Sequence, residues 1–386
     1  MTHTTNTRSH TLPMKQFLLA HSADQPAEQL LASCIEQLGE IPAEASFGFL
    51  YISDALAPQA DTLLSSLKQA TGVQHWVGST GIALLATNQE YYSEFAMVVM
   101  LADFSPDDFR MLPNIEDSLE AIPAECREWC NTNDFNVGLL HADPENPYVQ
   151  PLIHQLGAMI PNSFLVGGIS SSTTQHNIQF ADNALHGGIS GVVFSPAIRL
   201  LSNLTQGCTP IGPKHRITES SKNLAYRLDN KPALDVLTDD TGEVIARDWQ
   251  QAANYIFAGL VNQQSDTDDY TVRQLIGVDT EQRRFAISDY LEQGQEIIFC
   301  RRDGNSALQD MQRMLQQLKS RLDSPIRGGI YISCLGRGRQ QFGSNSEEVK
   351  LIHATLGEFP LAGFFANGEI HRSMLYGFTG VLTLFV

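Results

Sequence analysis

A cysteine and two arginines lie close together near the C-terminus, and residues of these types often form catalytic or anion-binding sites. An apolar run at residues 329–333 stops at Cys334, and Arg337 and Arg339 alternate with glycines directly after it. β-branched and aromatic residues in such a run predict a buried strand. Glycines let the following turn approach a ligand closely, and guanidinium groups bind carboxylates through paired hydrogen bonds. The spacing indicates an anion-binding corner, or else a basic surface turn beside a small buried thiol.

Two carboxylates are candidates for the opposite end of the same ligand. Asp143 follows a predicted strand at residues 136–141, and Glu369 follows another at residues 359–366. Either carboxylate could bind an ammonium group beside Arg337, although a salt bridge between two strand ends is the alternative for Arg337 and Glu369. Three glycines at strand positions would leave room for the ligand: Gly167, Gly168 and Gly363.

Catalysis is the less favoured alternative to binding. Cys334 could act as a nucleophile if Arg337 and Arg339 favoured its thiolate. The nearest bases in the sequence are His353 and His371. Nothing in the sequence shows that either histidine faces the thiol, so we expect a binding protein rather than an enzyme.

The composition excludes several classes of partner. The formal net charge is −18, so nucleic acid or an anionic membrane would repel the chain as a main partner. The six cysteines are scattered without a Cys-x-x-Cys pair, which fits reduced thiols in the cytosol. No apolar run is long enough for a membrane span, so we expect a cytoplasmic protein. Residues 1–13 are polar and are expected to be disordered.

A weak internal repeat suggests how the elements position these residues. Residues 48–53, 138–143 and 329–334 share a pattern of glycine followed by aliphatic or aromatic residues. A helix, a strand, a hairpin-like turn and a closing strand follow each copy. Three strand–helix–strand–strand units would place Ser53, Asp143 and Cys334 at equivalent strand ends. A further helix is predicted over residues 115–132, with an interruption at Pro123.

Glycines and prolines at residues 206–213 predict a boundary between two domains. The expected units are residues 14–215 and residues 216–386. Each would be an α+β domain, with a mixed, largely antiparallel sheet flanked by helices.

Several motifs occur in an order that resembles the FIST-domain family, which has an N-terminal and a C-terminal domain. The N-terminal likeness covers residues 166–168, 191–192, 206–212, Thr218 and 232–234. The C-terminal likeness covers residues 272–279, 294–303, 334–338, Glu347, 360–365, 367–370 and Thr379. Together these motifs run through about residues 47–386.

The resemblance implies a stand-alone bacterial signal-transduction sensor. Such a protein would bind a small polar, amino-acid-like metabolite at the domain junction and signal through a partner such as a histidine kinase. One branch of the family is described as haem-binding nitric-oxide sensors, so haem is an alternative ligand. Its axial ligand would be a histidine, and the N-terminal region offers His75, His141, His154 and His215. Whether the chain forms a homodimer is left open.

Overall fold

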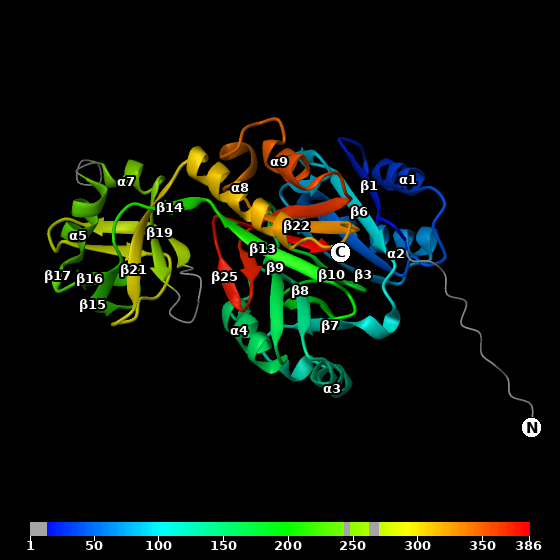
Figure 1. The fold of residues 1–386 in the computed structure, drawn as a ribbon, viewed down its shortest axis with the longest axis horizontal. Coiled ribbons are helices and arrows are strands. Elements are labelled where there is room, and N and C mark those ends of the chain that lie inside the picture. Colours follow the sequence, from blue (N-terminus) through cyan, green and yellow to red (C-terminus); the bar gives the residue numbers. More distant parts are fainter. Residues whose placement is uncertain (1–13, 243–247, 262–269) are drawn as a thin grey trace, which may run out of the picture.

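The computed structural model describes residues 14–242, 248–261 and 270–386. The expected disorder of residues 1–13 therefore lies outside the described residues. The chain forms a large body of three sheets and a smaller, β-rich lobe at one end of the molecule (Figure 1). The expected α+β class, with mixed and largely antiparallel sheets flanked by helices, is confirmed.

The body contains three sheets of six strands with the same internal order. In each sheet an antiparallel pair is followed by a central strand, a parallel neighbour and a short hairpin. The first sheet runs β1 (Leu18–Ala23), β6 (Ala96–Ala102), β2 (Phe47–Ser53), β3 (His75–Gly81), β10 (Gln179–Ala181) and β11 (Ala184–Leu185). The second runs β7 (Phe109–Ile115), β12 (Ile189–Phe194), β8 (Asn136–Ala142), β9 (Ser163–Ile169), β24 (Glu369–His371) and β25 (Met374–Tyr376). The third runs β13 (Leu200–Gln206), β26 (Thr379–Phe385), β22 (Gly328–Cys334), β23 (Leu361–Ala366), β4 (Leu84–Ala86) and β5 (Gln89–Tyr91).

The three units exchange their hairpins in a closed cycle. The hairpin β4–β5 lies in the first unit along the chain, but β4 pairs with β23 of the third sheet. The hairpin β10–β11 of the second unit joins β3 of the first sheet, and β24–β25 of the third unit joins β9 of the second. Each unit therefore completes the sheet of another unit, and the three sheets form one body.

Two helices cover the outer face of each sheet, while the inner faces share one core. Aromatic and aliphatic side chains from all three sheets pack together at the centre, among them Phe49, Leu139 and Phe364. The covering pairs are α1 (Ala27–Leu38) with α2 (Ala60–Thr71), α3 (Ala124–Thr132) with α4 (Val149–Met159), and α8 (Gly304–Arg321) with α9 (Glu347–Leu356). The buried face of α8 consists of Ala307, Met311, Met314, Leu315 and Leu318.

The lobe is an insertion between β13 and α8 of the third unit. Its sheet curls until β18 pairs with β21, which closes it around its own apolar core. Its strands are β14 (Cys208–Pro210), β15 (His215–Ser221), β16 (Leu224–Leu228), β17 (Lys231–Pro232), β18 (Ile256–Val261), β19 (Tyr270–Asp279), β20 (Arg284–Ile287) and β21 (Glu296–Arg302). Its helices are α5 (Ala233–Thr241) and α7 (Trp249–Ala252).

Two of the three body sheets combine strands from both sides of the boundary expected between residues 215 and 216. The exchanged hairpin β24–β25 joins the second sheet, and β13 and the exchanged hairpin β4–β5 join the third, whereas all six strands of the first sheet lie before the boundary. The helix predicted over residues 115–132 is wrong in its first half. Strand β7 ends at Ile115, and α3 begins only at Ala124, directly after Pro123, whose ring fits the first turn of a helix.

Candidate functional site

The repeat determines where the predicted site residues lie. Leu50, Leu140 and Tyr331 each pair in parallel with a glycine, namely Gly78, Gly167 and Gly363. Three residues further along are Ser53 and Cys334, the last residues of β2 and β22, and Asp143, the first residue after β8. The three positions are therefore equivalent in register.

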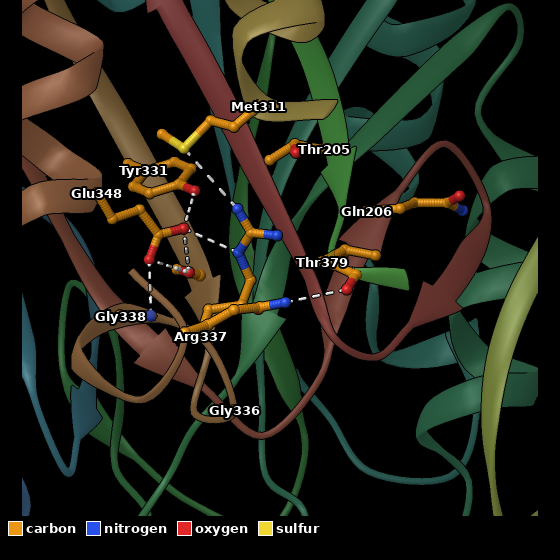
Figure 2. A network of polar contacts seen from close by, with 12 residues as sticks. Thr205, Gln206, Met311, Tyr331, Gly336, Arg337, Gly338, Glu348 and Thr379 are labelled. Carbon is orange, nitrogen blue, oxygen red and sulfur yellow. Dashed lines mark hydrogen bonds and ion pairs between the residues drawn. The ribbon is translucent and has the colours of Figure 1, made fainter. Parts of the chain in front are cut away.

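Arg337 turns inward from the loop after β22 and is 1% exposed. Its Nε donates to Glu348 Oε1 at 2.8 Å, and the guanidinium lies 4.9 Å from the centre of the Phe342 ring. Its Nη2 lies 3.9 Å from the sulfur of Met311 (Figure 2). The guanidinium predicted to bind a ligand carboxylate thus binds a carboxylate of the protein.

Glu348 is the acceptor at the centre of this buried network and is fully buried itself. Its Oε1 accepts from the Tyr331 hydroxyl at 2.6 Å, and its Oε2 accepts from the Gly338 N–H at 2.8 Å. The Ser333 hydroxyl also lies within 3.2 Å of both oxygens. Figure 2 shows Tyr331, Arg337 and Gly338 converging on this carboxylate. The sequence analysis did not identify Glu348. Its position four residues before Ile352 places both side chains on the same, buried face of α9, and this spacing could have indicated a buried carboxylate.

Glu369 and Cys334 lie close to Arg337 in the same interior. Thr379 donates to Glu369 Oε2 from its backbone N–H at 3.1 Å and from its hydroxyl at 2.8 Å, while Oε1 has no hydrogen-bond partner among the described side chains and backbone groups. Burial raises the pKa of Glu369 to about 8, against the opposing effects of Thr379 and Arg337. Burial also raises the pKa of the Cys334 thiol well above its usual range, with Glu369 adding to the shift. Cys334 is therefore a protonated thiol at neutral pH.

The three glycines make room for neighbouring protein atoms. A Cβ on Gly363 would lie 1.8 Å from the Tyr331 carbonyl oxygen, and one on Gly167 would lie 1.9 Å from that of Leu140. A Cβ on Gly168 would meet the Ile332 side chain at 2.6 Å. These glycines permit close packing of strands and sheets around the inner core.

Asp143 lies apart from this network, in a cavity of about 480 Å³ on the second unit. Its carboxylate accepts from the backbone N–H groups of Glu145 at 3.0 Å and Gly187 at 2.7 Å. The Asn146 amide donates to the Gly187 carbonyl at 2.9 Å. These bonds tie the loop after β8 to the turn before β12, so the floor of the cavity is already ordered.

The cavity walls are rich in hydrogen-bond acceptors. Asn177 lines it and is 6% exposed, yet its Oδ1 has no hydrogen-bond partner in the part of the chain that the structure describes. The carboxylates around the cavity are those of Glu116, Asp117, Asp143 and Glu145, and His176 and His186 complete its polar rim. Among the described residues, no three His, Cys, Asp or Glu side chains converge as metal ligands would. Asn177 carried no sequence signal, because its position depends on a loop between β9 and β10.

Two of the four histidines considered as haem ligands, His141 and His215, contact side chains of the protein. His141 is fully buried, with Nε2 3.3 Å from the Tyr51 hydroxyl and its ring packed against Phe364. His215 lies between Asp229 and Asp240, at 2.6 and 2.9 Å. Both rings thus already contact side chains of the protein.

The histidines considered as partners of Cys334 are also engaged elsewhere. Both ring nitrogens of His353 lie near backbone carbonyls, those of Val349 at 3.0 Å and Phe359 at 3.1 Å. The His371 ring packs edge-on against Phe164, with centroids 4.9 Å apart. The described contacts thus give the thiol no base.

Comparison with known proteins covers most of the chain. Residues 46–231 match the FIST N domain, and residues 233–372 match the FIST C domain. The uncharacterized protein MT0656 of Mycobacterium tuberculosis is 28% identical over 339 residues, which are 85% of this chain and 88% of that protein. The uncharacterized protein Mb0898c of Mycobacterium bovis is 28% identical over 365 residues, 91% of this chain and 92% of that protein. Every helix among the described residues is too short or too polar to cross a bilayer.

Proposed function

We propose that this chain, which belongs to the FIST family, senses a small metabolite carrying an ammonium group. The domains of this family are associated with signal-transduction sensing. The ligand would be of amino-acid size and would bind in the cavity around Asp143 and Asn177. The observation that carries this proposal is the buried, unpartnered Oδ1 of Asn177 in a cavity edged by carboxylates.

The chemistry of the cavity suits a cation that donates several hydrogen bonds. A buried amide oxygen without a partner costs free energy, and an ammonium N–H would remove that cost. The carboxylates of Glu116 and Asp117 at the edge would attract the charge and hold it near Asn177. His176 and His186 could donate to a ligand carboxylate, which is why an amino acid fits the proposal. A volume of about 480 Å³ is ample for such a ligand.

The sensor would report to a separate signalling protein, such as a histidine kinase, in the cytoplasm. The association of the family with signal transduction supports this step. The interior around Cys334, Arg337, Glu369 and the three glycines is a second candidate site for the metabolite. A ligand carboxylate there could accept from Arg337 Nη1, which has no hydrogen-bond partner among the described residues, while Nε donates to Glu348.

Thermal unfolding with a small-molecule panel tests the proposal. A ligand that binds only the folded protein raises its melting temperature. We expect at least one compound among the L-amino acids, ethanolamine and putrescine to do so. Each amine is compared with its counterpart lacking nitrogen, for example ethanolamine with ethylene glycol and alanine with propionate.

The counterparts decide between the candidate sites. If no amine raises the melting temperature, or if the nitrogen-free counterparts raise it equally, the ammonium proposal is wrong. Stabilisation by aliphatic carboxylates without an amine would favour the interior around Arg337 instead.

A further inference from the structure

A second cavity, of about 280 Å³, is lined by other residues than the cavity around Asn177. It is enclosed where β13 and the last turn of α8 meet the turn after β24 and the starts of β8 and β9. The residues that matter for its chemistry are Phe135, Phe164, Ser202, Arg321, His371 and Arg372.

The polar part of this cavity is cationic. Arg321 belongs to the last turn of α8, and its Nη1 lies 3.4 Å from the Ser202 carbonyl oxygen. Arg372 is in the left-handed conformation, with φ of 58°, in the tight turn between β24 and β25. Among the described residues that line the cavity there is no carboxylate, although the chain as a whole has a formal net charge of −18. Two guanidinium groups without a facing carboxylate attract an anion into a hollow with low-dielectric walls.

The remaining wall is aromatic. Phe135 is 43% exposed, which makes it one of the few large apolar side chains at the surface of the described residues. Phe164 lies deeper, with its ring packed edge-on against the imidazole of His371, which is 5% exposed. A flat apolar group would cover Phe135 and remove its ring from water.

We propose that this cavity binds a small organic anion that carries one flat apolar group. The carboxylate or phosphate of the ligand would lie between Arg321 and Arg372, and its ring would lie against Phe135 and Phe164. A volume of about 280 Å³ accommodates one ring with one anionic group and little more. This ligand needs an anionic group and a ring but no ammonium group, whereas the ligand proposed for the cavity around Asn177 must carry an ammonium group, so the two proposals stand or fall separately.

Calorimetric titration of the full chain at low ionic strength tests the proposal with benzoate, phenyl phosphate, inorganic phosphate and benzyl alcohol. Saturable binding is expected for benzoate or phenyl phosphate, and whichever binds more tightly identifies the preferred anion. Inorganic phosphate and benzyl alcohol, which each lack one half of the ligand, should bind at least roughly tenfold more weakly. The double variant Arg321→Gln/Arg372→Gln should weaken binding by roughly tenfold to a hundredfold, and Phe135→Ala by a smaller factor.

A matched pair of substitutions separates local recognition from bulk charge. Arg283→Gln/Arg301→Gln removes the same charge from the lobe, at side chains 55% and 60% exposed, and should leave the affinity unchanged. Arg321 and Arg372 are exposed, so far-UV circular dichroism should confirm native folding of the test variant. Failure of both aromatic anions to bind wild type overturns the proposal, and so does an equal loss in the two double variants.

Discussion

At the scale of single residues, Glu348 determines what Arg337 can do. The carboxylate accepts from a guanidinium, a tyrosine hydroxyl, a serine hydroxyl and a backbone N–H, and both charged groups are out of contact with water. A buried ion pair adds little net stability compared with apolar residues, but removal of one partner leaves an uncompensated charge. The pair therefore holds the loop after β22 in place as long as both members are present.

Replacement of Glu348 by Gln should destabilise the protein by about 3–5 kcal/mol, because Arg337 stays charged and buried. Urea unfolding followed by circular dichroism measures the loss. The exposed pair Arg199–Asp323 is the control, and Asp323→Asn should change the unfolding midpoint little. Equal midpoints for Glu348→Gln and wild type would show that the buried pair does not hold the loop.

Glu369 gives the folded protein a pH dependence of stability. Its pKa is about 8 in the folded protein against 4.5 ordinarily, so the folded state keeps a proton that the unfolded chain has lost. This contribution is fully present below about pH 4.5 and is lost as the pH rises through about 8. We expect the melting temperature to fall across this window and Glu369→Gln to flatten the fall.

Glu90 also contributes to the pH dependence of stability, in the lower part of that pH window. Burial and the nearby Glu348 raise the pKa of Glu90 to about 7, so its contribution has the same sign but ends earlier. The interval from about pH 7 to 8 is therefore diagnostic for Glu369. An unchanged slope in Glu369→Gln over that interval would contradict the assignment.

Sequence reasoning reached some of these residues and missed others for physical reasons. It placed Cys334, Arg337 and Glu369 at strand ends, and they do lie close together because β22, β23 and β24 pack near one another. It did not predict Glu348 as the partner of Arg337, because which carboxylate of a helix start turns inward depends on how α9 packs. The sequence prediction placed Asp143 in the same site, but Asp143 lies in the cavity around Asn177, because it belongs to a different copy of the repeat.

At the scale of elements, the repeat was visible in the sequence but the hairpin exchange was not. The shared pattern of glycine and aliphatic residues identifies equivalent positions in the three central strands, whichever strands they pair with. The partner of a short hairpin such as β4–β5 is selected by long-range packing, and its few residues carry no signal for the third sheet. The same exchange contributes strands from both expected domains to the second and third sheets, whereas the first sheet contains strands from before residue 215 alone.

The glycine that pairs with the middle of each central strand is required by this packing. Gly167 has φ of 148°, and a Cβ there would lie 1.9 Å from a backbone oxygen that cannot move aside easily. We expect Gly167→Ala to destabilise the body by at least about 3 kcal/mol, measured by urea unfolding. Gly277→Ala is the control, since its Cβ would meet its nearest neighbour only at 3.9 Å. Similar midpoints for the two variants would argue against a tight contact between β8 and β9.

At the scale of the whole molecule, the exchanged hairpins make each unit depend on the others. A ligand that orders the loops around Asn177 would act on β10–β11, which completes the first sheet, and on β12 in the second. The lobe contacts the same body through Arg273, which donates to the Leu375 carbonyl of the exchanged hairpin β24–β25 at 3.3 Å. These connections are physical routes by which binding in one unit could be reported elsewhere.

The central claim is tested most directly by isothermal titration of wild type and Asn177→Leu with the amine that stabilises wild type best. Leucine keeps the size of the side chain and removes the amide oxygen, so the affinity should fall by roughly tenfold or more. Asn183→Leu, an exposed substitution of the same kind, should bind as wild type does. Equal affinity of wild type and a correctly folded Asn177→Leu would contradict the account, because the cavity around Asn177 would then not be where the ligand binds.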